Sequence, residues 1–526
     1  MSLIILAASV GLILVILYFQ RKLQFSFSDH YFHIAMVRAI KANRHRFVKE
    51  HPNFLVEENF AYPQLYHWLL SFLPEKVYTE RHYLVNVASS LLSFATVELL
   101  LWFLFRDMFA NPALEVPLCG LLLSTTPIFY LPWNARNMGL SPRSMGVLLG
   151  QAFALLSLYN LLHFDWLVTG LVLLTGILSV LSSQFTTQFV VFSSLLMSAL
   201  FLRVWPLATL FLSFFIPWVF MPSVMKKYFR GQLWHKYIFS KYLSREYVLA
   251  ARYSIWGDFA GEIFRHFKRN GKSAIMYTYS NPLLLLVWAI PMFFPVLIAG
   301  AMHLSLPLPN MNTPAFPGSA DAALWTLTYF NGLGLLLFVT FSFRKTRFLG
   351  EPERYVELFV PAILLEFFVL APRMETNISI AIALYSLLVL AALFVIQYRS
   401  GSKTIVQRQQ AFDRLYETAL PDMQGGSLLS NSWHVMRRFY GTDIKTFTPC
   451  FTGMRTGEIS LTDIFKESFI YMDASCIGPI TATYPIDYCI VDTEVVGGAG
   501  WQQQMENGAG KRLAKVDQFI VYKLKP

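Results

Sequence analysis

Residues 28–33 of this chain read Ser28-Asp29-His30-Tyr31-Phe32-His33, and they follow a first apolar segment at residues 2–19. Placing a carboxylate and two histidines beside an apolar segment costs desolvation free energy. Such an arrangement therefore suggests that these side chains have a function. A second polar and aromatic cluster, residues 57–67, follows before the next apolar segment begins at residue 84. The two clusters therefore share one long loop next to a membrane.

The composition is that of a membrane protein. The 526 residues are 55% hydrophobic and only 14% charged, whereas soluble domains carry roughly 25% charged residues. A helix needs about 20 apolar residues to cross a bilayer. Residues 2–19 lack a preceding basic segment and a cleavage site, which favours a retained span over a removable signal peptide. We predict a mainly α, polytopic membrane protein with about eleven spans, at residues 2–19, 84–105, 114–132, 145–162, 166–182, 188–202, 204–222, 282–303, 322–343, 356–372 and 376–396.

Two domains are expected. Residues 1–398 form the membrane domain, and residues 399–526 form a small C-terminal α/β or α+β domain outside the bilayer. The second domain begins with a helical pattern at Ile405 to Thr418 and continues with short runs rich in β-branched and aromatic residues. These predicted strands are Ile480–Tyr484, Tyr488–Asp492 and Phe519–Tyr522.

Two long loops of the membrane domain have distinct patterns. In loop 20–83, Phe32, Met36, Ala39 and Ile40 recur at helical spacing, which predicts a helix lying on the membrane with its apolar side down. Loop 223–281 combines basic and aromatic residues, which suits the headgroup zone of a bilayer and predicts one or two interfacial helices.

Asp29 is the first candidate site residue. Partial desolvation beside a membrane raises the pKa of a carboxyl group, so Asp29 is a plausible general base, with His30 and His33 tuning it or binding an anion. Asp29 and His33 are also four residues apart, so on a helix they share a face and could hold a divalent metal. The alternative is a solvated helix N-cap, because Ser28 and Asp29 precede a helical pattern.

The second cluster contains Tyr62, Pro63 and His67. Proline favours the first turn of a helix, and a histidine four residues later could donate a hydrogen bond to a phosphate oxygen. An interfacial aromatic anchor with a satisfied histidine is the alternative. Glu57 and Glu58 are candidate second acids or solvated loop carboxylates.

A third candidate is Arg354, at the mouth of a late span. Arginine binds phosphate through a forked pair of hydrogen bonds, and a position at the membrane surface suits a lipid phosphate. The alternative is a helix-flanking arginine that reaches the headgroups. Arg136 and Arg143 in loop 133–144 have the same two interpretations.

Other chemistries lack their signatures. The chain has no Walker-type glycine loop, no GxSxG and no HExxH, and its four cysteines have no CxxC metal spacing. Ionisable residues within the spans are few, mainly Glu98 and Glu366, which weakens a transporter reading.

The arrangement resembles the GT-C class of polytopic glycosyltransferases. In that class an acidic residue sits in the first large loop, followed by surface helices and often a YP…H segment. The matching residues here are Asp29 in SDHYFH and Tyr62, Pro63 and His67 in YPQLYH. The segment Glu353–Tyr355 and the mixed tail also resemble some bacterial and archaeal members. The sequence motifs that carry this resemblance occupy a small part of the chain, whereas the resemblance in overall architecture extends over the whole chain.

The resemblance implies transfer of a sugar from a polyprenyl-phosphate donor to a glycan, lipid or protein acceptor, with membrane lipids but no nucleic acid as partners. Asp29 would deprotonate the acceptor hydroxyl. His67, Arg354 and the bases of loop 223–281 would neutralise the donor phosphate, with Tyr62, Glu58 and Arg136 as further substrate contacts. Many members carry paired acids where this chain has Asp29-His30, so no cofactor is certain and a divalent metal, Mg or Mn, is the alternative.

The expected orientation is ambiguous. The class places its acidic loop on the extracytoplasmic side of the cell membrane, and we expect the active face there. The loops on that face hold 26 Lys and Arg, against only Arg106, Arg203 and Arg373 on the other. By the positive-inside rule this bias favours the cytoplasm. A face that handles phosphorylated lipids has its own reason to be basic.

Two other function classes remain open from the sequence. A transporter or flippase of lipid-linked sugars needs many spans and a basic face, but it predicts ionisable residues at mid-membrane and has no need of Asp29. A membrane scaffold whose tail binds a partner has no use for the two loop clusters.

Overall fold

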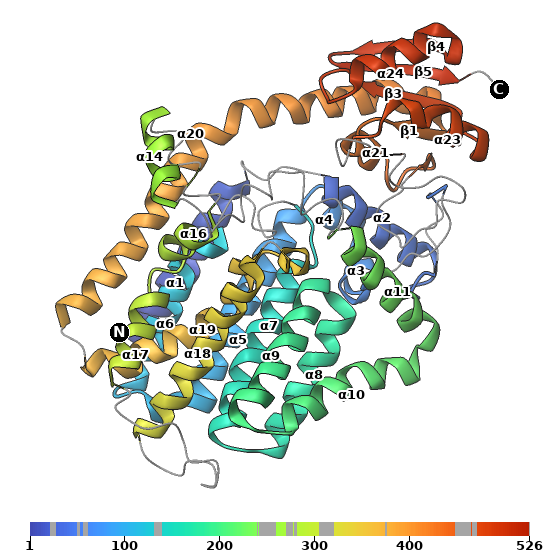
Figure 1. Ribbon diagram of the computed structural model, residues 1–526. Helices are drawn as coiled ribbons and strands as arrows, with labels where there is room; N and C mark the ends of the chain where they lie inside the picture. The colour runs from blue at the N-terminus through green and yellow to red at the C-terminus, as the bar shows by residue number, and fades with distance from the viewer. Residues whose placement is uncertain are drawn as a thin grey trace.

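The computed structural model describes residues 1–21, 28–49, 53–55, 62–130, 139–238, 259–269, 281–303, 320–343, 345–373, 376–447 and 471–524, with the single positions 240, 277 and 464. It shows a helical bundle with a small mixed domain above one end (Figure 1). The predicted class, a mainly α membrane protein with a small C-terminal domain that contains a sheet, is confirmed.

The helices of the membrane part follow one another in the order of the sequence. They are α1 (Ser2–Arg21), α2 (Ser28–Ala42), α3 (Leu65–Ser71), α4 (Glu75–Thr79), α5 (His82–Phe105), α6 (Pro112–Thr125), α7 (Arg143–Leu162), α8 (Trp166–Ser182), α9 (Gln184–Phe201), α10 (Trp205–Phe220), α11 (Pro222–Ile238), α14 (Phe259–Arg269), α16 (Pro282–Ala289), α17 (Phe293–His303), α18 (Ala320–Ser342), α19 (Pro352–Leu370) and α20 (Thr376–Met423).

Helix starts follow the local sequence. Proline occupies the first turn of α6, α10, α16 and α19, where its missing N–H costs nothing. Asp165 caps α8 by accepting a hydrogen bond from Val168 N–H at 3.0 Å, and Asn281 caps α16 by accepting from Leu283 and Leu284. Leu202, with φ 51°, separates α9 from α10, as the predicted break between 188–202 and 204–222 requires.

Within the described residues, five helices are long and apolar enough to cross a membrane. They are His82–Met108, Pro112–Tyr130, Arg143–Leu162, Gln184–Phe201 and Ala322–Ser342. The segment predicted as a span at 282–303 consists of two helices, α16 and α17, which are bent by 82° at a break that contains Pro291, so this span stays a prediction. Four shorter apolar helices include Ser2–Tyr18 and Ile380–Ala392. The total of eleven spans stays a prediction.

Helix α19 forms the centre of the bundle. It is buried along nearly its whole length and packs against α6, α7, α16, α17 and α18. Small residues allow close approach, as where Gly150 of α7 meets the Leu358 side chain and Gly334 of α18 meets Phe359. Glu366 lies fully buried here, and Asn331 donates to its carboxylate at 2.6 Å together with Thr328. This carboxylate is satisfied inside the bundle.

The tail is a mixed sheet covered by short helices. The strands are β1 (Ser427–Ser430), β2 (Lys445–Thr446), β3 (Tyr488–Asp492), β4 (Gly510–Val516) and β5 (Phe519–Leu524), with α21 (Trp433–Arg438), α23 (Ile477–Thr483) and α24 (Gly498–Gln504) between them. The order is β2-β1-β3-β5-β4, with β1 parallel to β2 and β3, and β5 antiparallel to β3 and β4. The predicted strands Tyr488–Asp492 and Phe519–Tyr522 are confirmed.

The tail differs from the prediction in one strand and at the domain boundary. The strand predicted at Ile480–Tyr484 is wrong, because this segment belongs to α23, where Ile477 and Ile480 bury one helical face. The predicted boundary between residues 398 and 399 falls inside α20, which runs without a break from the last predicted span into the tail (Figure 1). The division of the chain into two domains stays a prediction.

Helix α2 lies between the bundle and the tail, and its position differs from the expectation. Phe32, Met36, Ala39 and Ile40 pack with residues of the tail such as Met436, not against lipid. The opposite face of α2 packs on α3 and α5 through Ile34 and Val37. The tail replaces the bilayer as the apolar partner of this helix.

Candidate active site

The site begins at the first turn of α2, which carries Asp29. Acidic residues are favoured near a helix N-terminus. The Asp29 side chain is 63% exposed, and Arg437 Nη1 of α21 donates a hydrogen bond to its Oδ1 at 2.6 Å. This carboxylate is thus open on one side and held by a cation on the other.

His33 lies one turn further along α2 and is buried. Its Nδ1 is 2.9 Å from Nε2 of His67 in α3, and the two rings stack at 5.1 Å. The Tyr62 ring lies 5.7 Å from that of His33 and 5.8 Å from that of His67. Gln64 fixes this turn, because its amide bonds both the N–H and the carbonyl of Val48 at 2.8 Å. Asp29, His33, Tyr62 and His67, four predicted residues, therefore converge.

The ionisation of the cluster follows from its surroundings. Burial lowers the pKa of His33 to about 4, with the charge of Asp29 opposing the shift. Burial and the nearby His33 lower the pKa of His67 well below its usual value, while a hydrogen bond to the Pro63 carbonyl opposes this shift. Burial, reinforced by Asp29, raises the pKa of Tyr62. At neutral pH all three side chains are therefore uncharged.

Asp29 behaves differently. Desolvation by the surrounding protein raises the pKa of the Asp29 carboxyl group, but the positive charge of Arg437, with smaller effects of His33, Arg143 and His434, outweighs it, so the pKa is lowered. Asp29 is therefore ionised at neutral pH, and it is the one predicted catalytic residue with a largely exposed side chain.

His30 lies on another side of α2 and is buried. Its Nδ1 accepts a hydrogen bond from Leu140 N–H at 3.0 Å, and its ring lies 4.3 Å from that of His82. Gly139, with φ +94°, approaches so closely that a Cβ there would come within 3.0 Å of the imidazole. Asn86 of α5 holds the same turn by donating to the Gly139 carbonyl. These contacts fix the start of α7 and with it Arg143.

Arg354 lies at the same end of the bundle as Arg143. The Leu358 side chain of α19 contacts Gly150 of α7. Arg354 precedes Leu358 by one helical turn, and Arg143 precedes Gly150 by two turns, roughly 10 Å along α7. Arg354 pairs with Glu351, and its side chain is 18% exposed. The hydroxyl of neighbouring Tyr355 donates to Gln188 of α9 and to the Leu349 carbonyl.

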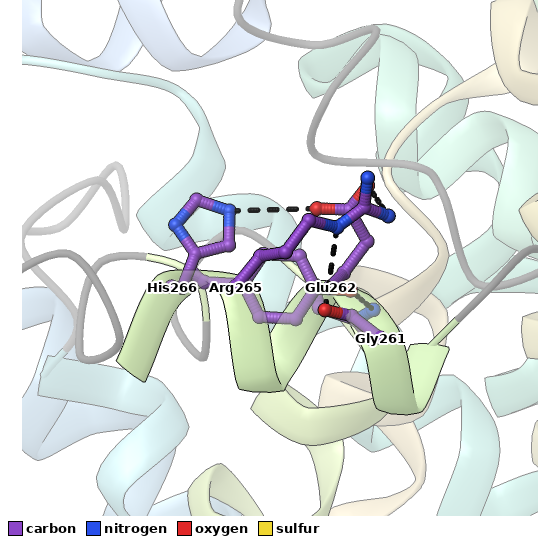
Figure 2. Close-up of polar contacts among 6 residues, drawn as sticks. Gly261, Glu262, Arg265 and His266 are labelled. Carbon is purple, nitrogen blue, oxygen red and sulfur yellow. Dashed lines mark hydrogen bonds and ion pairs between the residues drawn. The ribbon is translucent and has the colours of Figure 1, made fainter. Parts of the chain in front are cut away.

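Basic residues of α11 and α14 belong to the predicted interfacial loop. Lys227 of α11 donates to the Lys49 carbonyl at 3.0 Å, and Tyr228 donates to Thr187 at 3.1 Å, so α11 covers the segment before α3. In α14, Glu262 pairs with Arg265 at 2.8 Å and approaches His266 at 3.8 Å (Figure 2). Phe264 and Phe267 of the same helix are exposed, as expected for a helix in contact with lipid.

Asp29 and His33 do not fit a magnesium or manganese site. Both ions prefer several oxygen ligands, but Arg437 binds the Asp29 carboxylate and His33 Nδ1 is engaged by His67. Over the part of the chain that the structure describes, no three His, Cys, Asp or Glu residues are grouped to hold a metal.

Some site residues were predicted and others were not. Glu58 and Arg136 lie outside the described residues. His82, His434 and Arg437 were missed. The basic pair Arg437-Arg438 beside Trp433-His434 was the available signal in the sequence, but Arg437 is 408 positions from its partner Asp29.

Comparison with known proteins supports the fold. No protein-family model and no curated protein sequence matches the chain. The crystal structure of the Archaeoglobus fulgidus oligosaccharyltransferase, in complex with Zn and sulfate, matches at a TM-score of 0.51 and 10% identity, over 98% of this chain and 73% of that one. The crystal structure of apo ArnT from Cupriavidus metallidurans matches at 0.40 and 10%, over 98% and 97%, which is too distant to carry an argument.

The chain has the GT-C fold. The likeness to the oligosaccharyltransferase confirms the fold predicted from the two loop motifs. At 10% identity it shows the architecture alone, so the reaction must be argued from the site.

Proposed function

We propose that this chain is a membrane glycosyltransferase that moves a sugar from a polyprenyl-phosphate donor to an acceptor hydroxyl. One observation carries the proposal, namely the exposed, ionised Asp29 carboxylate beside Arg437 at the end of a membrane bundle. The fold likeness to an enzyme named as an oligosaccharyltransferase supports the reaction class.

Asp29 acts on the acceptor. As the acceptor oxygen attacks the anomeric carbon, its proton passes to a carboxylate oxygen of Asp29, and the bond from that carbon to the phosphate oxygen breaks. The products are the glycosylated acceptor and polyprenyl phosphate. A base positioned in this way contributes typically 10²–10⁴-fold to the rate.

Cations stabilise the departing phosphate. Arg143 and Arg354 lie near the starts of α7 and α19 at one end of the bundle, and Lys227 of α11 contacts the first loop through the Lys49 carbonyl. Charge placed where negative charge develops is typically the largest electrostatic contribution in such a transfer. The donor phosphate is proposed to lie between these groups. There the Arg354 guanidinium would bind the phosphate in place of the Glu351 carboxylate.

The buried histidines support Asp29 without touching substrate. His67 holds His33 through the 2.9 Å contact, and His33 stands one turn behind Asp29. His30 holds the turn that starts α7 and so positions Arg143. The exposed aromatic and basic side chains of α14 suit the lipid surface from which the donor enters.

The active face is proposed to be extracytoplasmic. The Arg437 contact puts the first loop and the tail on one side of the membrane, so an even number of crossings lies between them. A total of eleven spans satisfies this condition, because ten of them follow the first loop. A reporter fused to the C-terminus and active only in the cytoplasm would contradict the orientation.

Replacing Asp29 by Asn tests the function. The amide keeps the shape but cannot accept the proton, so we expect the rate of sugar transfer to fall at least ~100-fold in proteoliposomes containing a polyprenyl-phosphate sugar. Asp517→Asn is the matched control, because Asp517 also pairs with an arginine, Arg414, but is not part of the proposed site. Wild-type transfer by Asp29→Asn would refute the assignment.

A further inference from the structure

The tail reaches the proposed active site through Arg437. Arg437 belongs to α21, and its side chain is only 8% exposed although the Asp29 carboxylate that it binds is 63% exposed. Its guanidinium also stacks over the Trp433 ring at 4.2 Å. A buried arginine is expensive without an anionic partner. The Asp29 carboxylate therefore provides a counter-charge for the buried Arg437 of the tail, and Arg437 in turn holds the Asp29 carboxylate.

The neighbouring arginine anchors α21 without touching Asp29. Arg438 pairs with Asp413 of α20 at 3.0 Å, and its guanidinium stacks over Tyr31 of α2 at 4.4 Å and over Tyr416 of α20 at 3.9 Å. Gln409 of α20 donates to the Tyr31 hydroxyl at 3.2 Å. Three helices thus meet at Tyr31, two residues from Asp29.

The turn after α21 adds further contacts with the first loop. The Gly441 carbonyl accepts a hydrogen bond from Arg38 at 2.7 Å. Phe54 forms a bridge to Thr446 of β2, so the first loop extends the edge of the tail's sheet. The position of Arg437 is consequently set by contacts on both sides of it.

We propose that Arg437 is a positioning residue for the transfer reaction, through which the docked tail holds and orients the Asp29 carboxylate. This inference rests on the proposed function of Asp29. One carboxylate oxygen is fixed by the guanidinium, and the exposed side of the carboxylate is presented to the acceptor. A chain with an intact bundle but a displaced tail would then be inactive, because Asp29 would lose both its orientation and its counter-charge.

The groups that lower the pKa of Asp29 come from three elements. His33 lies on α2, Arg143 on α7, and His434 and Arg437 on α21. The Arg437 charge is the largest of these influences, and it lowers the pKa of Asp29. Removing it raises that pKa, so Asp29 becomes protonated at a higher pH and the acidic limb of the rate profile moves upward.

The test is a double-mutant cycle on sugar transfer by the full-length protein. We expect Arg437→Met to reduce kcat by at least ~10-fold, to move the acidic limb of kcat/KM to higher pH, and to leave the KM for the donor nearly unchanged. Arg437→Lys should restore part of the rate. In the Asp29→Asn background, Arg437→Met should cost little more, because residues that act through one another are not additive.

Arg414→Met is the matched control. Arg414 also pairs with an aspartate, but this partner is Asp517 of the tail and not Asp29, so we expect an unchanged rate and pH profile. A full independent loss from Arg437→Met in the Asp29→Asn background, or an unmoved acidic limb, would overturn the inference while leaving Asp29 as the base. Wild-type activity of Asp29→Asn would instead overturn the proposed function itself.

Discussion

At the scale of single residues, the site is one ionised carboxylate held by Arg437, beside two buried, uncharged histidines. His33 and His67 bind each other within the protein, and the Tyr62 ring closes the group. The sequence could indicate these residues because they lie in one loop and Asp29 and His33 share a helical face. It could not indicate Arg437, because no local pattern links residues 408 positions apart.

The buried histidines should make stability depend on pH. The pKa of His33 is lowered to about 4 in the folded chain, against an ordinary value near 6.5. The unfolded chain therefore takes up a proton first as the pH falls, so stability declines from about pH 6.5 down to about pH 4, by ~3 kcal/mol from His33 at most.

Thermal unfolding in detergent between pH 7.5 and pH 4.5 measures this dependence. We expect His33→Gln to flatten it, because glutamine does not titrate. His163→Gln is the control, since His163 is exposed at the end of α7. An equally steep decline in His33→Gln would show that His33 does not carry the effect.

At the scale of elements, the apolar periodicity located the helices, but it did not reveal their partners. The pattern of α2 predicted its helix correctly, yet the tail and not lipid covers Met36 and Ile40. The apolar run 282–303 hid the bend between α16 and α17. The run at Ile480 has β-branched residues in a segment that packs as a helix, since burial of Ile477 and Ile480 overrides a weak local preference.

Gly441 tests the docking of the tail on α2. It has φ +77°, and a Cβ there would lie 3.3 Å from Ala35 Cα and 3.3 Å from Arg38 Nη1. We expect Gly441→Ala to loosen the contact and to speed hydrogen exchange of the α2 amides. Gly425→Ala is the matched control, because Gly425 has φ +71° with open space around it and incurs only ~1 kcal/mol of backbone strain. Equal exchange in the two variants would argue against a close contact at Gly441.

At the scale of the whole molecule, the proposed site lies where the first loop and the tail meet at one end of the helical bundle. Helix α20 continues from the last predicted span into the tail, and the tail lies against the first loop, which comes from the opposite end of the sequence (Figure 1). The sequence could predict the GT-C fold from its loop motifs and spans. The joint site of loop and tail emerges only when the chain is folded.

The central claim is that this protein cleaves a lipid-phosphate sugar and does not merely move it across the bilayer. The most direct measurement supplies the purified protein in proteoliposomes with a polyprenyl-phosphate sugar and an acceptor, and quantifies free polyprenyl phosphate by mass spectrometry. We expect polyprenyl phosphate to be released in an amount equal to that of the glycosylated acceptor. Asp29→Asn should abolish this release. A donor that crosses the bilayer but stays intact would contradict the central claim.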